Sequence, residues 1–147
     1  MTRRTLAAAV VAAALAPLSA AAQHVGDCEV WQANARNVVW EAETPTYGNG
    51  AIRFVLLDTE APATAAYYLM VIYPAPDEAF EECRLVASVE GLGFAALGLH
   101  ASMSRYDPAE GLTLSLPAAA FLEGGPVEGH LDVVVNRATG EVRATMR

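Results

Sequence analysis

Some histidine and methionine residues of this protein are spaced in the chain so that their side chains could bind a metal ion. His24 would be the third residue of an exported chain if processing removed the residues up to Ala21. A third-position histidine, the free amine and two backbone amides form a square-planar site for Cu²⁺ or Ni²⁺. Processing after Ala22 would destroy that site. His100 and Met103 are copper-type ligands, but a spacing of three on a strand directs them to opposite faces. We therefore expect no metal or other cofactor, and keep His24 and His100 as candidate ligands.

Carboxylates are concentrated in one short stretch, at Asp77, Glu78, Glu81 and Glu82. They could offer oxygen atoms to Ca²⁺, but they lack the alternating ligand spacing and the turn glycine of a calcium loop. Prolines followed by acidic residues complement the positive end of a helix dipole. The segment 74–82 is therefore predicted to be one short helix with a solvated first turn.

Catalytic motifs are absent from the sequence: it has no Gly-x-Ser-x-Gly, no His-Glu-x-x-His and no phosphate-binding glycine loop. A serine, histidine and aspartate set could be assembled by chance, as in any protein of this size. Its members would be Ser102 or Ser104, His100 or His130, and Asp107 or Asp132. We expect no enzymatic activity from these residues.

Tryptophans and tyrosines gather in the first half of the exported part: Trp31, Trp40, Tyr47, Tyr67, Tyr68 and Tyr73. Of these, Trp31, Trp40, Tyr67 and Tyr68 are the candidate ligand-binding residues. Neighbours alternate across a strand, so Tyr67 and Tyr68 must face opposite layers. In a barrel, one face of 67–73 would line an interior that holds a small apolar ligand. In a sandwich, both faces would pack against other elements. The sequence leaves these two alternatives open.

Arg53 is the one charged residue in a strand otherwise composed of isoleucine, phenylalanine, valine and leucine. Its face is either exposed to solvent, or partly buried and paired with an acid such as Asp58. A buried arginine in a concave site could anchor a carboxylate. We expect exposure, and keep Arg53 as a candidate ligand-binding residue.

The first 22 residues have the layout of a secretory signal peptide, with Arg3 and Arg4 before an apolar stretch and a small-residue cleavage site. The predicted mature chain, 23–147, carries seven basic residues against 17 acidic ones, a net charge of −10. Such a surface repels nucleic acid. The longest apolar run of the predicted mature chain, 65–73, is too short to span a bilayer. We expect a periplasmic or secreted location.

Cys28 and Cys83 are the only cysteines, and both lie in the exported part. In an oxidising compartment two such cysteines usually pair. A redox-active pair normally has its two thiols close in sequence, as in Cys-x-x-Cys. The sequence therefore predicts a structural disulfide between Cys28 and Cys83.

Short apolar segments separated by turn residues recur about every ten residues, a spacing typical of an all-β sandwich or barrel. We predict a single antiparallel β domain of about eight strands, with one short helix at 74–82. The expected strands are 28–32, 37–42, 51–57, 67–73, 84–89, 94–103, 112–116 and a hairpin over 131–146. The hairpin has the most specific pattern, because two alternating runs flank a turn that Asn136 opens and Gly140 closes.

Function follows from these features only at the level of a class. Export, acidity, β structure and the absence of catalytic motifs favour a non-catalytic module that binds an envelope protein or another envelope component. The first alternative is a small-ligand carrier with an aromatic-lined pocket. A small hydrolase-like enzyme is the second alternative.

Overall fold

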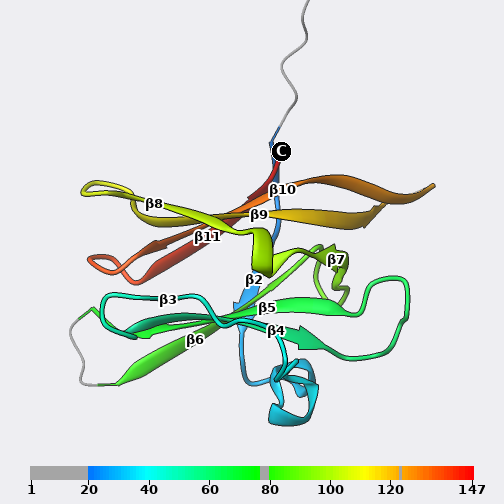
Figure 1. The fold of residues 1–147 in the computed structure, drawn as a ribbon, viewed down its shortest axis with the longest axis horizontal. Coiled ribbons are helices and arrows are strands. Elements are labelled where there is room, and N and C mark those ends of the chain that lie inside the picture. Colours follow the sequence, from blue (N-terminus) through cyan, green and yellow to red (C-terminus); the bar gives the residue numbers. More distant parts are fainter. Residues whose placement is uncertain (1–19, 77–79, 123) are drawn as a thin grey trace, which may run out of the picture.

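The computed structural model describes residues 20–76, 80–122 and 124–147, which form two packed layers of β-strands (Figure 1). Most of the expected signal peptide lies outside these residues, as do Asp77 and Glu78. The described part contains eleven strands, all of them in antiparallel pairs. The predicted all-β antiparallel class is confirmed, and the strand number exceeds eight partly because two strands have only two residues.

Each layer has its own strand order. The lower layer in Figure 1 consists of β2 (His24–Asp27), β6 (Glu81–Ala87), β5 (Tyr67–Pro74), β4 (Ile52–Asp58) and β3 (Thr46–Tyr47). The upper layer consists of β1 (Ala21–Ala22), β11 (Glu141–Met146), β10 (Gly125–Asn136), β9 (Gly111–Leu122) and β8 (Met103–Asp107). The part of the chain that the structure describes therefore starts in the upper layer with β1 and crosses to the lower layer with β2.

Strand β7 (Phe94–Leu97) joins the two layers along one side. It pairs with the second half of β9 and, through Phe94 and Tyr67, with the start of β5. The first half of β9 pairs instead with β8. The architecture is thus a sandwich that is closed along one side, which explains why the sequence was compatible with both a sandwich and a barrel.

The main core lies between the layers and follows the alternation expected from a two-residue period. Its side chains from β4 and β5 include Phe54, Leu69 and Val71, and those from β9 and β10 include Leu114 and Val133. All five of these residues are fully buried. Close packing of such side chains is what holds the two layers together.

A second, smaller core lies on the other face of the lower layer and contains Leu57, Tyr68, Leu85 and Ala87. Strand β5 contributes to both cores, because alternate residues of the strand face opposite sides. Both faces of 67–73 are therefore packed, as the sandwich alternative requires.

The predicted C-terminal hairpin is confirmed. Strands β10 and β11 pair with Val135 opposite Val142 and Asn136 opposite Glu141. Asn136 Oδ1 accepts hydrogen bonds from the turn amides of residues 138 and 139, at 3.0 and 3.3 Å. Gly140 has a φ of 71°, the left-handed conformation that the turn requires.

The strands expected at 28–32 and 37–42 are wrong. The chain there forms two 3₁₀ turns, η1 (Trp31–Ala33) and η2 (Ala35–Asn37). Asn34 caps η2 by accepting a hydrogen bond from the Arg36 amide at 3.1 Å. Such local side-chain bonds compete with strand pairing, and they outweigh the β propensity of the valines and tryptophans.

The helix expected at 74–82 is also wrong in its described part, since Pro74 ends β5 and Glu81 begins β6, opposite Pro74 in the register. Pairing of β6 with two neighbouring strands offers more hydrogen bonds than one isolated helical turn.

The strand expected at 94–103 is interrupted. Strand β7 ends at Leu97, the 3₁₀ turn η3 (Leu99–Ala101) follows, and β8 begins at Met103. The break occurs at Gly98, whose amide donates to the Pro117 carbonyl at 2.8 Å. Because β7 and β8 pair with different halves of β9, the chain needs this turn to move from one half to the other.

No helix of the described residues is long and apolar enough to cross a membrane.

Candidate functional site

Four aromatic side chains are strongly exposed in the described residues, and two of them, Trp31 and Trp40, lie on one segment, residues 28–42, which we call the tryptophan segment. The other two are Phe80, just before β6, and Tyr106, on β8. Trp31 is 60% exposed and Trp40 is 74% exposed, and they are the only tryptophans of the chain. Val30, beside Trp31, is also exposed. In Figure 1 this segment projects below the lower layer, as the blue and cyan coil that contains η1 and η2.

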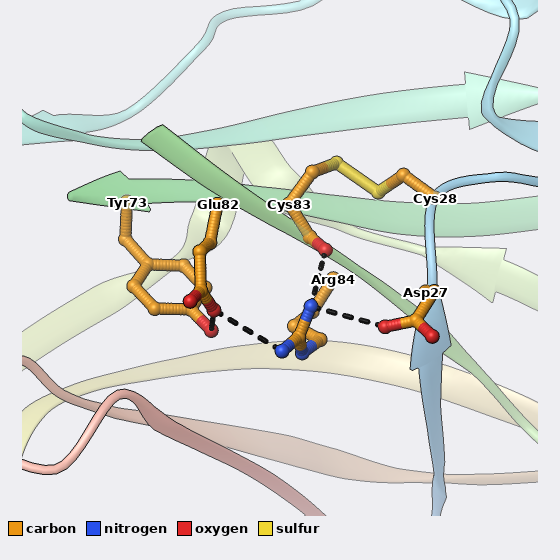
Figure 2. Close-up of a disulfide and its surroundings, with 6 residues drawn as sticks. All are labelled: Asp27, Cys28, Tyr73, Glu82, Cys83 and Arg84. Carbon is orange, nitrogen blue, oxygen red and sulfur yellow. Dashed lines mark hydrogen bonds and ion pairs between the residues drawn. A yellow bond between two sulfur atoms is a disulfide. The ribbon is translucent and has the colours of Figure 1, made fainter. Parts of the chain in front are cut away.

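The backbone of the tryptophan segment is fixed to the lower layer at several points. Cys28 is bonded to Cys83 of β6, which confirms the predicted disulfide (Figure 2). At its other end, the Val39 amide donates to the Leu56 carbonyl of β4 at 3.0 Å. Inside the segment, the buried Asn37 side chain donates to the carbonyls of residues 31 and 32, at 3.1 and 2.9 Å. The segment therefore presents its tryptophans from a constrained backbone.

Apolar packing adds to these bonds. Ala33 and Val38 of the tryptophan segment pack against the second core, where Leu57 and Tyr68 are buried. The segment thus serves as a third layer over the outer face of the lower sheet. Removing it would expose that apolar face to water, so burial stabilises the segment in its place.

A network of charged side chains surrounds the disulfide, and the acidic residues beside the two cysteines belong to it (Figure 2). Arg84 contacts Asp27 and Glu82, each at 3.1 Å, and donates to the Cys83 carbonyl at 3.0 Å. Asp27 precedes one cysteine, and Glu82 and Arg84 flank the other. The network therefore braces both ends of the bridge, which is a structural role.

Tyr73 extends this network to the upper layer. Its hydroxyl lies 2.7 Å from Glu82 Oε2 and 2.9 Å from the Gly140 carbonyl oxygen, so it has acceptors in both layers. Burial, followed by the hydrogen bond to Glu82, raises the pKa of Tyr73 to about 12. Both effects disfavour the ionised phenolate.

We expect Tyr73→Phe to be less stable than the parent protein by about 1 kcal/mol at pH 7, because Glu82 and the Gly140 carbonyl oxygen lose the single hydroxyl hydrogen that lies between them. The pKa of tyrosine is about 10 in an unfolded chain and is higher in the fold. The contribution of Tyr73 is therefore complete below pH 10 and is lost as the pH rises towards about 12. Urea denaturation of both proteins between pH 7 and pH 12 measures this, and a stability difference that stays constant would contradict it.

Arg53 is half-buried on β4 and pairs with Glu81 of β6, with 2.5 Å between Nη2 and Oε2. The partner suggested from the sequence, Asp58, instead accepts a hydrogen bond from the Glu60 amide at 2.8 Å. Because its guanidinium already has a carboxylate partner, Arg53 does not form a free anion anchor.

Tyr67 and Tyr68 face opposite sides of β5. Tyr67 packs against the main core, whereas Tyr68 belongs to the second core and donates to the Gly91 carbonyl at 3.3 Å. Tyr68 also borders a hollow of about 420 Å³, together with His24 and Val30. The structure therefore brings Tyr68 and His24 to the edge of the tryptophan segment, and it places Tyr67 elsewhere.

The candidate metal ligands remain separate. His24 lies on β2 and His100 on η3, where it borders another hollow with His130 and Glu128. Among the described residues, no three histidine, cysteine or acidic side chains gather as a metal site would require. His100 lies on η3 and Met103 on β8, so the expectation that both lie on one strand and face opposite sides of it is wrong. Met103 is 70% exposed.

The two aspartates of the chance catalytic set have structural contacts. Asp107 accepts hydrogen bonds from the amides of residues 110 and 109 in its own turn, which lower its pKa. Burial would raise the pKa of Asp132, but hydrogen bonds from Arg147 and Ser115, at 2.6 and 2.5 Å, outweigh burial and lower it. Neither carboxylate contacts a histidine in the described hydrogen bonds, so no triad is formed.

A cavity at one end of the sandwich was not expected from the sequence. It has a volume of about 650 Å³ and lies where the β3–β4, β8–β9 and β10–β11 turns meet. Its rim carries Tyr47, Tyr106 and Arg137. The turn residues at 107–111 and 136–140 are recognisable in the sequence, but nothing local indicates that these turns converge. We call this feature the end cavity.

Comparison of the chain with protein-family models, with curated proteins and with solved structures finds no match in any of the three.

Proposed function

We propose that this protein is an exported, non-catalytic binding module that contacts its partner through Trp31 and Trp40. The single observation that carries the proposal is the exposure of both tryptophans on a backbone fixed by a disulfide and by Asn37. An export signal at residues 1–22 and an oxidising compartment are in keeping with the disulfide. The partner is an envelope protein or another envelope component.

Energetics support such a role for the two tryptophans. Each exposes a large apolar surface to water, and burial of that surface against a partner is favourable. Tryptophan is enriched among the few residues that dominate binding energy at protein interfaces. A backbone that is already fixed loses little conformational freedom on binding, which further favours association.

Tryptophan fluorescence provides a direct test, because Trp31 and Trp40 are the only tryptophans in the chain. We expect emission to shift to shorter wavelength when the oxidised protein is titrated with periplasmic extract or with solubilised envelope membranes from its source. A variant with Trp31→Ala and Trp40→Ala should bind the same fraction about 30-fold more weakly, as loss of about 2 kcal/mol at an interface implies. Sedimentation or surface-plasmon binding measures this variant.

The matched control is Phe80→Ala, which removes an aromatic side chain that is 72% exposed and lies outside the tryptophan segment. It should bind like the parent protein. Equal weakening by both variants would show that general surface hydrophobicity is responsible. Unchanged binding by the double tryptophan variant, or no binding by the parent protein to either fraction, would overturn the proposal.

The small-ligand carrier requires a different location from the one first considered. Both faces of 67–73 are packed, so this strand lines no interior within the described fold. The end cavity is the feature that favours a small ligand, and it is independent of the tryptophan segment.

A further inference from the structure

The floor of the end cavity is apolar and belongs to the main core. Ile52 of β4, Leu112 of β9 and Val135 of β10 are buried there, at the edge where the core ends. The volume of about 650 Å³ is within the range of small-molecule sites. Three strands of both layers thus offer an apolar surface to one molecule.

The walls of the end cavity are held together by contacts between the layers. The Tyr73 hydroxyl lies 2.9 Å from the Gly140 carbonyl oxygen. Pro76 packs so closely on the β10–β11 turn that a Cβ added at Gly140 would stand 2.9 Å from its Cγ. These two contacts fix the spacing of the layers beside the cavity. Within the upper layer, at the β8–β9 turn, a Cβ added at Gly111 would stand 2.3 Å from the Val135 carbonyl oxygen, so β9 and β10 also pack closely there.

Arg137 brings a positive charge to the mouth of the end cavity. It lies in the β10–β11 turn of the upper layer, and its Nη1 is 3.8 Å from the position that a Cβ on Gly48 would take in the β3–β4 turn of the lower layer. The side chain therefore reaches from one layer to the other. Among the described residues it has no ion-pair partner.

The acids of the neighbouring β8–β9 turn are already engaged by other groups. The Glu110 carboxylate pairs with Arg143, with 2.6 Å between Oε2 and Nη2. Asp107 Oδ1 accepts two hydrogen bonds from amides of its own turn. Arg137 is therefore the group in the rim that can offer charge-assisted hydrogen bonds to an incoming molecule.

We propose that the end cavity binds a small amphipathic organic anion. Its apolar body occupies the floor formed by Ile52, Leu112 and Val135, beside the rings of Tyr47 and Tyr106. Its carboxylate or sulfonate group pairs with the guanidinium of Arg137 at the mouth. An apolar floor with one positive group at its edge selects this class against both hydrophilic anions and cations.

The probes for the test are 2-naphthoate and its neutral counterpart 2-naphthamide, titrated into the oxidised protein and followed by amide chemical shifts. Saturable shifts with 2-naphthoate are expected at Gly48, Gly111, Leu112 and Arg137. Arg137→Gln should weaken 2-naphthoate about tenfold and leave the weaker binding of 2-naphthamide unchanged, because only the anion uses the charge. The matched control is Arg36→Gln, which removes an arginine of the tryptophan segment and should change neither affinity.

A second variant, Ala138→Trp, tests the location without altering the core, because Ala138 is exposed on the rim of the end cavity. It should abolish binding of both probes while the urea midpoint stays that of the parent protein. Equal affinity of the parent protein and Arg137→Gln for 2-naphthoate would overturn the assignment. So would shifts centred on the tryptophan segment, or no saturable shifts at all. None of these results depends on whether Trp31 and Trp40 bind a partner.

Discussion

Replacement of both disulfide cysteines, by Cys28→Ser and Cys83→Ser together, is expected to lower the free energy of unfolding by about 4 kcal/mol. The bridge joins residues 55 positions apart, and opening this long loop gives the unfolded chain many more conformations. The folded state changes less, because the Arg84 network and the Val39–Leu56 hydrogen bond remain. Urea denaturation of the parent protein and of the double serine variant, both at pH 7 without a reducing agent, measures the loss.

Reduction provides the control for this prediction. A reducing agent should bring the parent protein to the stability of the double serine variant, and it should leave that variant unchanged. If the parent protein has the same urea midpoint with and without the agent, the bridge contributes nothing to stability. The same samples also report on the tryptophan segment, which should exchange its amide hydrogens faster once Cys28 is released.

Gly111→Ala is expected to destabilise the protein by about 3 kcal/mol, the second largest effect. Gly111 has a φ of 101°, a conformation that is strained for any residue with a Cβ. The added Cβ would also stand 2.3 Å from the Val135 carbonyl oxygen, so β9 and β10 would have to separate where they meet the end cavity. Thermal and urea denaturation measure the total cost.

Gly50→Ala separates the two causes. Gly50 also has a positive φ, 86°, but a Cβ added there has no other atom within 4 Å. This control should therefore lose only the conformational part, about 1 kcal/mol. Equal losses at the two positions would mean that the close approach of Val135 does not matter. In that case the description of the cavity wall would need to change.

Much of the fold could be predicted from local patterns. The alternation in 131–146 predicted the hairpin and its turn, because one face of each strand is buried and the other is solvated. The continuous apolar run at 67–73 predicted a strand, and the structure decided that both of its faces are packed. The pairing of Cys28 and Cys83 was predicted from their number and from their position after the expected signal peptide. The hairpin and the strand at 67–73 each follow from a pattern within a short stretch of sequence. The disulfide follows because two cysteines allow only one pairing.

The tryptophan segment shows where local patterns fail. Valine and tryptophan favour strands, and this propensity predicts strands at 28–32 and 37–42. The observed turns depend on Asn34 and Asn37, whose side chains bond to nearby backbone groups, and on an apolar sheet face beneath. Propensity carries no information about that face, because the face is built by β4, β5 and β6, which lie far along the chain.

Only the tertiary structure decided which residues meet across the two layers. The periodicity of a strand determines which side chains are buried, but it does not determine which strand lies two places away in the sheet. Arg53 therefore pairs with Glu81, across β5, and not with the nearby Asp58. The end cavity has the same origin: Tyr47 of β3, Tyr106 of β8 and Arg137 of the β10–β11 turn meet because the packing of the layers sets where the strands end. Sequence by itself determined the antiparallel β class, the C-terminal hairpin and the alternating faces of its strands. The turns at 28–42 and the candidate sites depend on contacts between distant segments that no local pattern encodes.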